Sequence, residues 1–306
     1  MDAIVNFKTP AALSRTAIAF ICMALWTHNL HAFDFVTPIK LTFSNSSPPM
    51  YRPSIRYLYT ESDFLNKGYY GYPIDYLRVL STYCHGGCSA DYPLSRQSVS
   101  EDAARGFHLV VNGTFFCYKW DCGDSLPLGP IIRDGQFVAN LEPKAAKRGV
   151  VAILNDGTLI VDRAQGTERN NIIARFNNPG NPPLQSLMGG GAMLIENGTA
   201  VSVEDIVGEQ KFCCGLKDGL CCNLYNGPFR SNVNHTVIGI KDGQGYVLVN
   251  INNKSGADVQ KDLLDMRFQS AVMFDGGGGF YFRHYKGTPF RNKDNPTGFG
   301  IFIRKY

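Results

Sequence analysis

Short apolar runs rich in β-branched residues, separated by glycine-containing turns, fill the chain from residue 107 onward. Runs of four to six such residues fit buried or half-buried strands and are too short for typical helices. Hairpin signals of the Asn-Gly or Asp-Gly type occur at residues 155–157, 196–198 and 241–243. The pattern predicts an α+β fold: a large mixed or mostly antiparallel sheet with few helices. The expected strands are residues 108–111, 150–154, 158–161, 191–195, 236–240, 246–251, 271–274 and 299–303.

Helices are expected in only two places. Residues 258–267 have an amphipathic spacing with an acidic start and a basic end, and residues 76–83 have the pattern of a short helix. The segment 33–106 is otherwise rich in Tyr, Pro and Ser, which predicts an irregular N-terminal subdomain. We therefore expect the sheet to form in a main domain of residues 107–306.

The first 32 residues have the features of a secretory signal peptide. Lys8 and Arg15 precede an apolar run at residues 16–26, which is too short for an ordinary transmembrane helix. We expect cleavage after Ala32 and a secreted or periplasmic protein without stable membrane insertion. A retained N-terminal anchor is the alternative.

Cysteine usage agrees with an oxidising compartment. Loss of residues 1–32 would remove Cys22 and leave eight cysteines, which predicts a fold stapled by four disulfides without fixing their pairing. A zinc site is the alternative, but adjacent cysteine pairs are poor tetrahedral chelators and no C-x-x-C spacing occurs. The disulfide candidates are Cys84, Cys88, Cys117, Cys122, Cys213, Cys214, Cys221 and Cys222.

Net charge does not identify a partner. The formal charge of +4 comes from 30 basic and 26 acidic residues spread along the chain. The chain lacks the basic run expected of a protein that binds nucleic acid or a membrane surface.

Two polar segments lie at strand ends. Asn112 and Gly113 end the run at 108–111; an amide can bind sugar hydroxyls as donor and acceptor, and glycine lets a ligand come close. His235 and Thr236 begin the run at 236–240, where a histidine can bind phosphate as an imidazolium or transfer a proton. A hairpin or bulge at Asn112, and an ordinary surface histidine, would explain the same residues.

Two glycine-rich segments follow. Gly189, Gly190 and Gly191 would expose consecutive N–H groups that suit an anion, although a simple glycine-rich turn is the commoner outcome. Asp275 leaves the run at 271–274 into four glycines, where a partly desolvated carboxylate suits acid or base catalysis or metal binding. Hydrogen bonds from its own turn are the structural alternative.

Taken in order, these segments resemble the sequence pattern of the phosphodiester glycosidase family. That pattern is a strand ending N-G-G-F-F, then P-L-G, G-G-G-P/A-L-L-I-x-x-G, R-T-A-I-G and L-D-G-G-G-S-S. Each motif is weak alone, whereas five in the same order are specific. The likeness covers residues 107–285, and the matching segments are residues 112–116, 127–129, 189–198, 235–239 and 274–278.

The resemblance implies an exported hydrolase that needs no cofactor and acts on a sugar 1-phosphate diester or a cell-surface polysaccharide. Asp275 would be the acid, base or transition-state stabiliser. Asn112 would orient a sugar hydroxyl, and His235 would face the leaving phosphate or donate a proton. The residues expected to contact the substrate are Gly113, Gly189, Gly190, Gly191, Thr236, Gly276 and Gly277.

Two departures from the family pattern leave alternatives open. His235 replaces the family's arginine, which grips phosphate bidentately and stays charged, and Gly279 and Phe280 replace its two serines. A secreted carbohydrate-binding protein that keeps the fold without turnover is the first alternative. A divalent-metal phosphodiesterase with Asp275 as a ligand is the second, although no His/Asp cluster has metal-ligand spacing.

Two further features bear on the site. Ordinary glycosidase chemistry requires a second carboxylate, and Asp134, Asp162 and Asp242 are the candidates, each of which also fits a turn or strand end. Asn112 and Asn234 each begin an N-x-S/T pattern and lie in the proposed site motifs. Glycans on either residue would therefore contradict the site. The pattern also begins at Asn45, Asn197 and Asn253.

Overall fold

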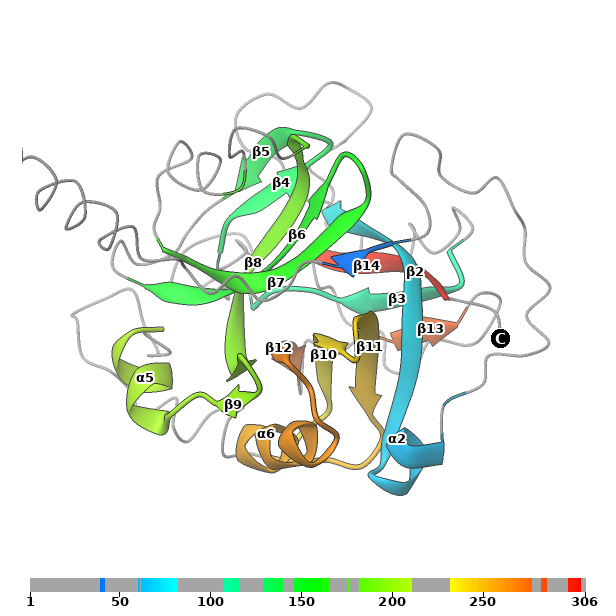
Figure 1. Ribbon diagram of the computed structural model, residues 1–306, viewed down its shortest axis with the longest axis vertical. Helices are drawn as coiled ribbons and strands as arrows, with labels where there is room; N and C mark the ends of the chain where they lie inside the picture. The colour runs from blue at the N-terminus through cyan, green and yellow to red at the C-terminus, as the bar shows by residue number, and fades with distance from the viewer. Residues whose placement is uncertain are drawn as a thin grey trace, which may run out of the picture. The chain divides into compact units, whose positions relative to one another are not determined.

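A single large sheet dominates the computed structural model of the chain (Figure 1). The structure describes residues 39–41, 60, 62–81, 107–115, 129–139, 146–165, 176, 182–210, 232–276, 282–284 and 297–303. The signal segment at residues 1–32 and all eight disulfide candidates lie outside these residues, so the predictions made for them stay predictions. Within the described residues, no helix has the length and apolar character needed to cross a bilayer.

Antiparallel pairing joins every strand pair in the described part of the chain, as expected for strands joined by short hairpins. The strand order is β1-β7-β6-β8-β12-β10-β11-β2-β14-β3-β13, with the β4–β5 hairpin and β9 attached to β8. The strands are β1 (Ile39–Lys40), β2 (Tyr69–Ser81), β3 (Leu109–Asn112), β4 (Ile131–Arg133), β5 (Gln136–Ala139), β6 (Lys147–Leu154), β7 (Thr158–Gln165), β8 (Leu184–Glu196), β9 (Thr199–Ala200), β10 (His235–Lys241), β11 (Gln244–Asn250), β12 (Ser270–Gly276), β13 (Phe282–His284) and β14 (Thr297–Ile303).

All eight strands expected from the apolar runs are present, and so are two hairpins with the backbone twist that suits antiparallel strands. In the β8–β9 turn, Asn197 and Gly198 have φ of 51° and 72°. In the β10–β11 turn, Asp242 and Gly243 have φ of 50° and 71°. Positive φ at both central positions defines the tight turns that Asn-Gly and Asp-Gly favour. The prediction of a mostly antiparallel sheet with few helices is confirmed.

One prediction for the N-terminal part is wrong: residues 76–83 do not begin a helix, because β2 runs to Ser81. The half-buried Asp75 and Arg78 are three residues apart with buried apolar residues between them, which imitates a helical period. A strand buried on both faces shows no clean alternation that would reveal it. The division at residue 106 stays a prediction, although β2 lies in the same sheet as β11 and β14.

The sheet curves so that strands far apart in its order face each other. Phe274 on β12 packs edge-on against Phe299 on β14, with ring centroids 5.0 Å apart. In the strand order, β10, β11 and β2 lie between these two strands. The same large apolar core includes Phe64, Val247 and Leu263. This curvature brings the end of β3, the neighbour of β14, to the end of β12.

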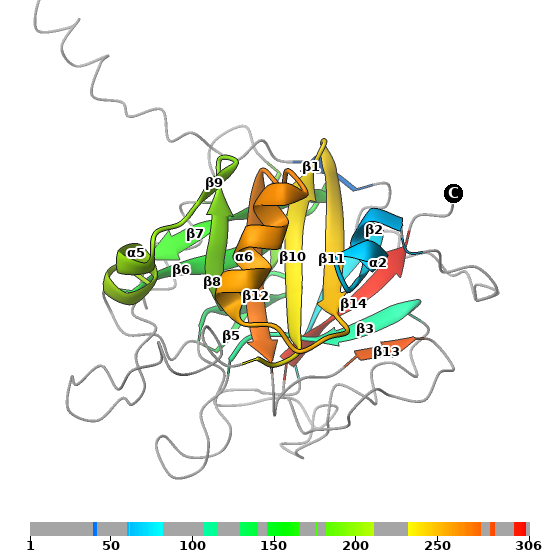
Figure 2. The ribbon, with the colours of Figure 1, turned by 90° about the horizontal axis from the view of Figure 1, so that it is seen from below.

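Helix α6 (Gly256–Asp265) lies across β10 and β12 (Figure 2). It agrees with the helix expected at residues 258–267. Ser255 caps its N-terminus in a reciprocal capping box with Asp258. Val259 and Leu263 are its buried apolar contacts, and Gln260 Nε2 donates at 2.8 Å to the carbonyls of both Leu194 and Val201. The short helix α2 (Ser62–Asn66) precedes β2.

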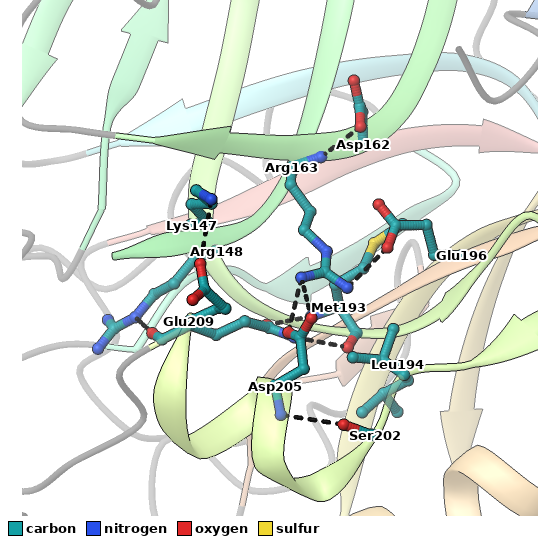
Figure 3. Close-up of polar contacts among 12 residues, drawn as sticks. Lys147, Arg148, Asp162, Arg163, Met193, Leu194, Glu196, Ser202, Asp205 and Glu209 are labelled. Carbon is teal, nitrogen blue, oxygen red and sulfur yellow. Dashed lines mark hydrogen bonds and ion pairs between the residues drawn. The ribbon is translucent and has the colours of Figure 1, made fainter. Parts of the chain in front are cut away.

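Helix α5 (Val203–Gly208) is fastened to β7 and β8 by a polar network (Figure 3). Arg163 donates to both carboxylate oxygens of Asp205, at 2.6 and 2.8 Å, and to Glu196 at 2.7 Å. The side chain of Gln210 bonds the main chain of Met193 as a neighbouring strand would, at 2.8 and 3.0 Å. Because Gln210 is fully buried, these bonds satisfy an amide that would otherwise destabilise the fold.

Candidate active site

Three segments that are distant in sequence meet at the ends of β3, β10 and β12. The Asn112 side chain donates from Nδ2 to the main-chain carbonyl of Asp275, 2.5 Å away. Its Oδ1 accepts a 2.7 Å hydrogen bond from the hydroxyl of Thr236. The Asp275 N–H donates to the carbonyl of Gly113 at 3.1 Å. Asn112 and Thr236 are fully buried, so these bonds replace solvation that both side chains have lost.

Asp275 lies at the centre of this junction. Asp275 is 8% exposed, and its Oδ1 accepts the N–H of Gly276 at 2.8 Å. A hydrogen bond of this kind, from the residues that follow Asp275, is the structural alternative to a catalytic role that the sequence left open. The main chain of Asp275 is held on both sides, by Asn112 and by Gly113. The carboxylate therefore belongs to a residue with little freedom to shift.

Gly276 is a glycine because β10 comes too close for a side chain. A Cβ at this position would collide with the carbonyl oxygen of Asn234 and would lie 2.7 Å from Nδ1 of His235. The register agrees, since His235 is the partner of Gly276 in the β10–β12 pair. Close packing of two backbones thus explains the first glycine after Asp275. Gly277, also expected to contact the substrate, lies outside the described residues.

His235 is fully buried, and both its main chain and its ring have partners. Its main-chain N–H donates to the side-chain oxygen of Asn250, and its ring Nε2 lies 3.0 Å from the carbonyl oxygen of Lys254. Burial lowers the pKa of its imidazole to about 4, so the ring is neutral near pH 7. A neutral ring whose Nε2 already has a partner is poorly suited to hold a phosphate. The expected role facing the leaving phosphate gains no support from this geometry.

Gly189, Gly190 and Gly191 lie within strand β8 and not in a separate loop. The N–H of Gly189 donates to the carbonyl of Pro130 at 2.8 Å, and a Cβ on Gly189 would lie 2.6 Å from the Pro130 ring. A Cβ on Gly191 would collide with Val272 of β12. Packing therefore explains Gly189 and Gly191. Gly190 has a φ of 82°, in the left-handed region that favours glycine.

The three candidates for a second carboxylate lie on other elements. Asp134 and Asp242 occupy hairpin turns, and Asp134 forms a 3.0 Å ion pair with Arg78. Asp162 lies on β7, which β6 and β8 separate from β12 in the strand order. Within the described ranges, no three His, Cys, Asp or Glu side chains are grouped so that they could hold a metal ion.

Residues that the sequence did not single out complete the site. Asn250 holds the His235 N–H and donates from Nδ2 to the carbonyls of Val233 and Asn252, at 2.9 and 2.8 Å. Lys254 supplies the carbonyl that faces His235. The only signal for Asn250 is its position as a polar residue near the end of an apolar run, and Lys254 acts through its main chain, which no sequence pattern reveals.

The fold and this junction define a predominantly antiparallel β protein with a buried polar site at the ends of β3, β10 and β12. The phosphodiester glycosidase (NAGPA) family model matches residues 105–303. The chain therefore belongs to the phosphodiester glycosidase family, a family of hydrolases, as the ordered motifs predicted.

One solved structure shares the fold. The catalytic domain of zebrafish N-acetylglucosamine-1-phosphodiester alpha-N-acetylglucosaminidase, auto-inhibited by its pro-peptide, superimposes with a TM-score of 0.53 at 20% sequence identity. That alignment covers 75% of this chain and 73% of the zebrafish chain. A Burkholderia pseudomallei protein described as exported gives a TM-score of 0.46 at 12% identity, over 74% of this chain and 71% of that one. Comparison with curated protein sequences gives no match.

Proposed function

We propose that the chain is an exported hydrolase that cleaves the glycosidic bond of a sugar 1-phosphate diester, with Asp275 acting at the scissile bond. The observation that carries the proposal is the junction of β3, β10 and β12 on the main chain of Asp275. Membership of a family of hydrolases supports the reaction class. A carboxylate held in place before substrate arrives needs no reorganisation during reaction, which is how enzymes gain most of their rate.

The position of the other carboxylates favours a phosphodiester over a polysaccharide. In the proposed reaction, the oxygen of water bonds to the anomeric carbon while the bond from that carbon to the bridging oxygen breaks. Asp275 accepts a proton from the water, and the electron pair leaves with the phosphate. A phosphate monoester leaves without being protonated, whereas a sugar alkoxide needs a general acid. Asp134 occupies the β4–β5 turn, and Asp242 follows the end of β10 opposite to His235. Asp162 lies on the face of β7 that it shares with Ile160, opposite to Val161, which belongs to the same core as Phe274.

Purified protein incubated with a panel of sugar 1-phosphate diesters and glycan polymers tests the proposal. Asp275→Asn is the informative variant, and Asp162→Asn is its matched control. Both aspartates are buried strand residues, with exposed fractions of 8% and 7%. We expect the control to keep its activity and Asp275→Asn to lose it. Equal rates for the wild type and Asp275→Asn would refute the assignment of Asp275.

A carbohydrate-binding protein without turnover is the second candidate, and the state of His235 favours it. The family's arginine would present a permanent charge at this position, whereas His235 is buried and neutral. Calorimetry with the same panel separates the candidates. Binding without product in the wild type would support the second candidate, and product formation that depends on Asp275 would exclude it.

A further inference from the structure

Lys254 lies where the entrance to β10 meets helix α6. Its main chain pairs with Val233, just before β10, through hydrogen bonds of 3.0 and 3.1 Å. Its ammonium group donates to Oδ2 of Asp262 on α6 at 2.5 Å and to the carbonyl of Lys67 at 2.7 Å. One residue therefore connects β10, α6 and the turn that leads into β2.

The side chain of Lys254 has a complete set of partners for a lysine that is largely out of water. The side chains of Lys254 and Asp262 are 19% and 14% exposed. Besides its two oxygen partners, the ammonium lies 4.7 Å from the centroid of the Tyr69 ring, whose hydroxyl donates to Asp262 at 3.0 Å. Three donors and three partners fix the ammonium in one place. We call Lys254, Asp262 and Tyr69 the α6 clamp.

The carbonyl of Lys254 determines the state of His235. This oxygen accepts from the N–H of Val233 at 3.1 Å and faces Nε2 of His235 at 3.0 Å. Because a carbonyl oxygen cannot donate, Nε2 must carry the proton, and Nδ1 of the neutral ring is left as an acceptor. Nδ1 is buried and has no hydrogen-bond partner within the described residues.

His235 in turn faces the residue that follows Asp275. A Cβ on Gly276 would lie 2.7 Å from Nδ1, so the bare edge of the imidazole packs against the Gly276 backbone. The N–H of Gly276 donates to Oδ1 of Asp275. A proton on Nδ1 would place a donor hydrogen against the Gly276 backbone, which would then have to move.

We propose that Lys254 is a positioning residue for Asp275: the α6 clamp fixes the Lys254 carbonyl, which holds His235 as the Nε2–H tautomer and so keeps the Gly276 backbone in place. The role in reaction rests on the proposed function of Asp275. The tautomer does not, and it can be measured whether or not the chain turns over a substrate.

Nitrogen-15 NMR of the imidazole rings tests the tautomer directly. In the wild type we expect His235 to give one protonated and one unprotonated nitrogen. The His235→Gln variant assigns the signal, or, if that variant does not fold, single substitutions of the other histidines assign it by elimination. In Lys254→Met we expect the two nitrogen shifts to move toward each other as the tautomers begin to exchange. Asp262→Asn serves the same purpose if Lys254→Met does not fold.

Lys147→Met is the matched control. Its ammonium forms a 3.0 Å ion pair with Glu209, and Lys147 lies on β6 and not on β2, β10 or α6. This variant should leave the His235 nitrogen shifts unchanged. If Lys254→Met and Asp262→Asn both fold and keep the wild-type shifts, the clamp only fastens α6 to β2 and the proposal is wrong.

Kinetics connect the tautomer to Asp275. We expect Lys254→Met to lower kcat by about 10-fold to 100-fold with little change in KM, since a misplaced reacting group costs rate more than binding. A changed tautomer with an unchanged kcat would overturn the positioning role. A wild type without activity would contradict the proposed function and leave the NMR result to decide on the tautomer.

Discussion

The side-chain amide of Asn112, on β3, donates to the main-chain carbonyl of Asp275, on β12, over 2.5 Å. The two residues are 163 positions apart in sequence, and the same amide accepts the hydroxyl of Thr236 from β10. Asn112 was expected to orient a sugar hydroxyl. Its bonds in the structure point to a role inside the protein, where it ties three strands together at the proposed reacting residue.

Asn112→Leu should destabilise the fold strongly. It removes both hydrogen bonds and leaves the Asp275 carbonyl and the Thr236 hydroxyl buried without this partner. Each such group costs roughly 1–3 kcal/mol, so we expect a loss of about 2–5 kcal/mol in urea denaturation. Thr236→Val removes only one of the two bonds and should cost about 1 kcal/mol. A loss for Asn112→Leu no larger than that for Thr236→Val would contradict the junction.

Gly276→Ala should damage the site because its Cβ meets the Asn234 carbonyl and His235 Nδ1. Backbone atoms cannot rotate away as a flexible side chain can, so β10 and β12 must separate. We expect a lower free energy of unfolding and a lower kcat. Gly208→Ala, at the end of α5, is the control, because a Cβ there meets nothing within 4 Å. Two variants of equal stability would show that β10 and β12 are not packed this tightly.

The stability of the protein should fall as the pH drops from 6.5 to 4. The pKa of His235 is about 4 in the folded state, below the ordinary value of 6.5. Between these values the unfolded chain binds a proton that the folded protein does not, so acid favours unfolding. The loss amounts to about 3 kcal/mol and levels off below the folded pKa. His235→Gln should show a shallower dependence over this window, and an identical slope would mean that His235 does not titrate as proposed.

Glycosylation offers a test of burial at the site. Asn112 and Asn234 are 0% and 2% exposed, and Asn234 Nδ2 donates to the Asn250 carbonyl at 2.9 Å. When the protein is expressed in a eukaryotic secretory host, we expect both to remain unmodified in mass spectra of its peptides. Asn197 and Asn253 are exposed and are the positive controls. A glycan on Asn112 or Asn234 in folded protein would show that this junction does not form.

Much of the fold follows from patterns within short segments. The apolar runs and Asn-Gly or Asp-Gly turns predict the antiparallel strands because both signals act over a few residues. β2 was not recognised as a strand because the polar Asp75 and Arg78 are spaced as on a helix, although both lie within a mostly buried strand. The β4–β5 hairpin was also missed, although its turn, Asp134-Gly135, carries the same signal as the three that were recognised.

The site residues were foreseen as a set, but their bonds were not. Asn112, Thr236, His235 and Asp275 could be named from their places at strand ends. Sequence could not show that Asn112 bonds to the main chain of Asp275, because that contact depends on the curvature that brings β3 to β12. Lys254 and Asn250 were missed for a related reason: their partners are main-chain groups, which every residue type possesses.

The position of oxygen-18 after hydrolysis in labelled water tests the central claim most directly. Wild-type protein and a sugar 1-phosphate diester are incubated in this water, and both products are analysed by mass spectrometry. We predict the label on the sugar, since water attacks the anomeric carbon, and at least about 100-fold less labelled sugar with Asp275→Asn, the loss expected when a general base is removed. Label on the phosphate would show that the phosphorus–oxygen bond is cut, and undiminished labelled sugar with Asp275→Asn would contradict the role of Asp275.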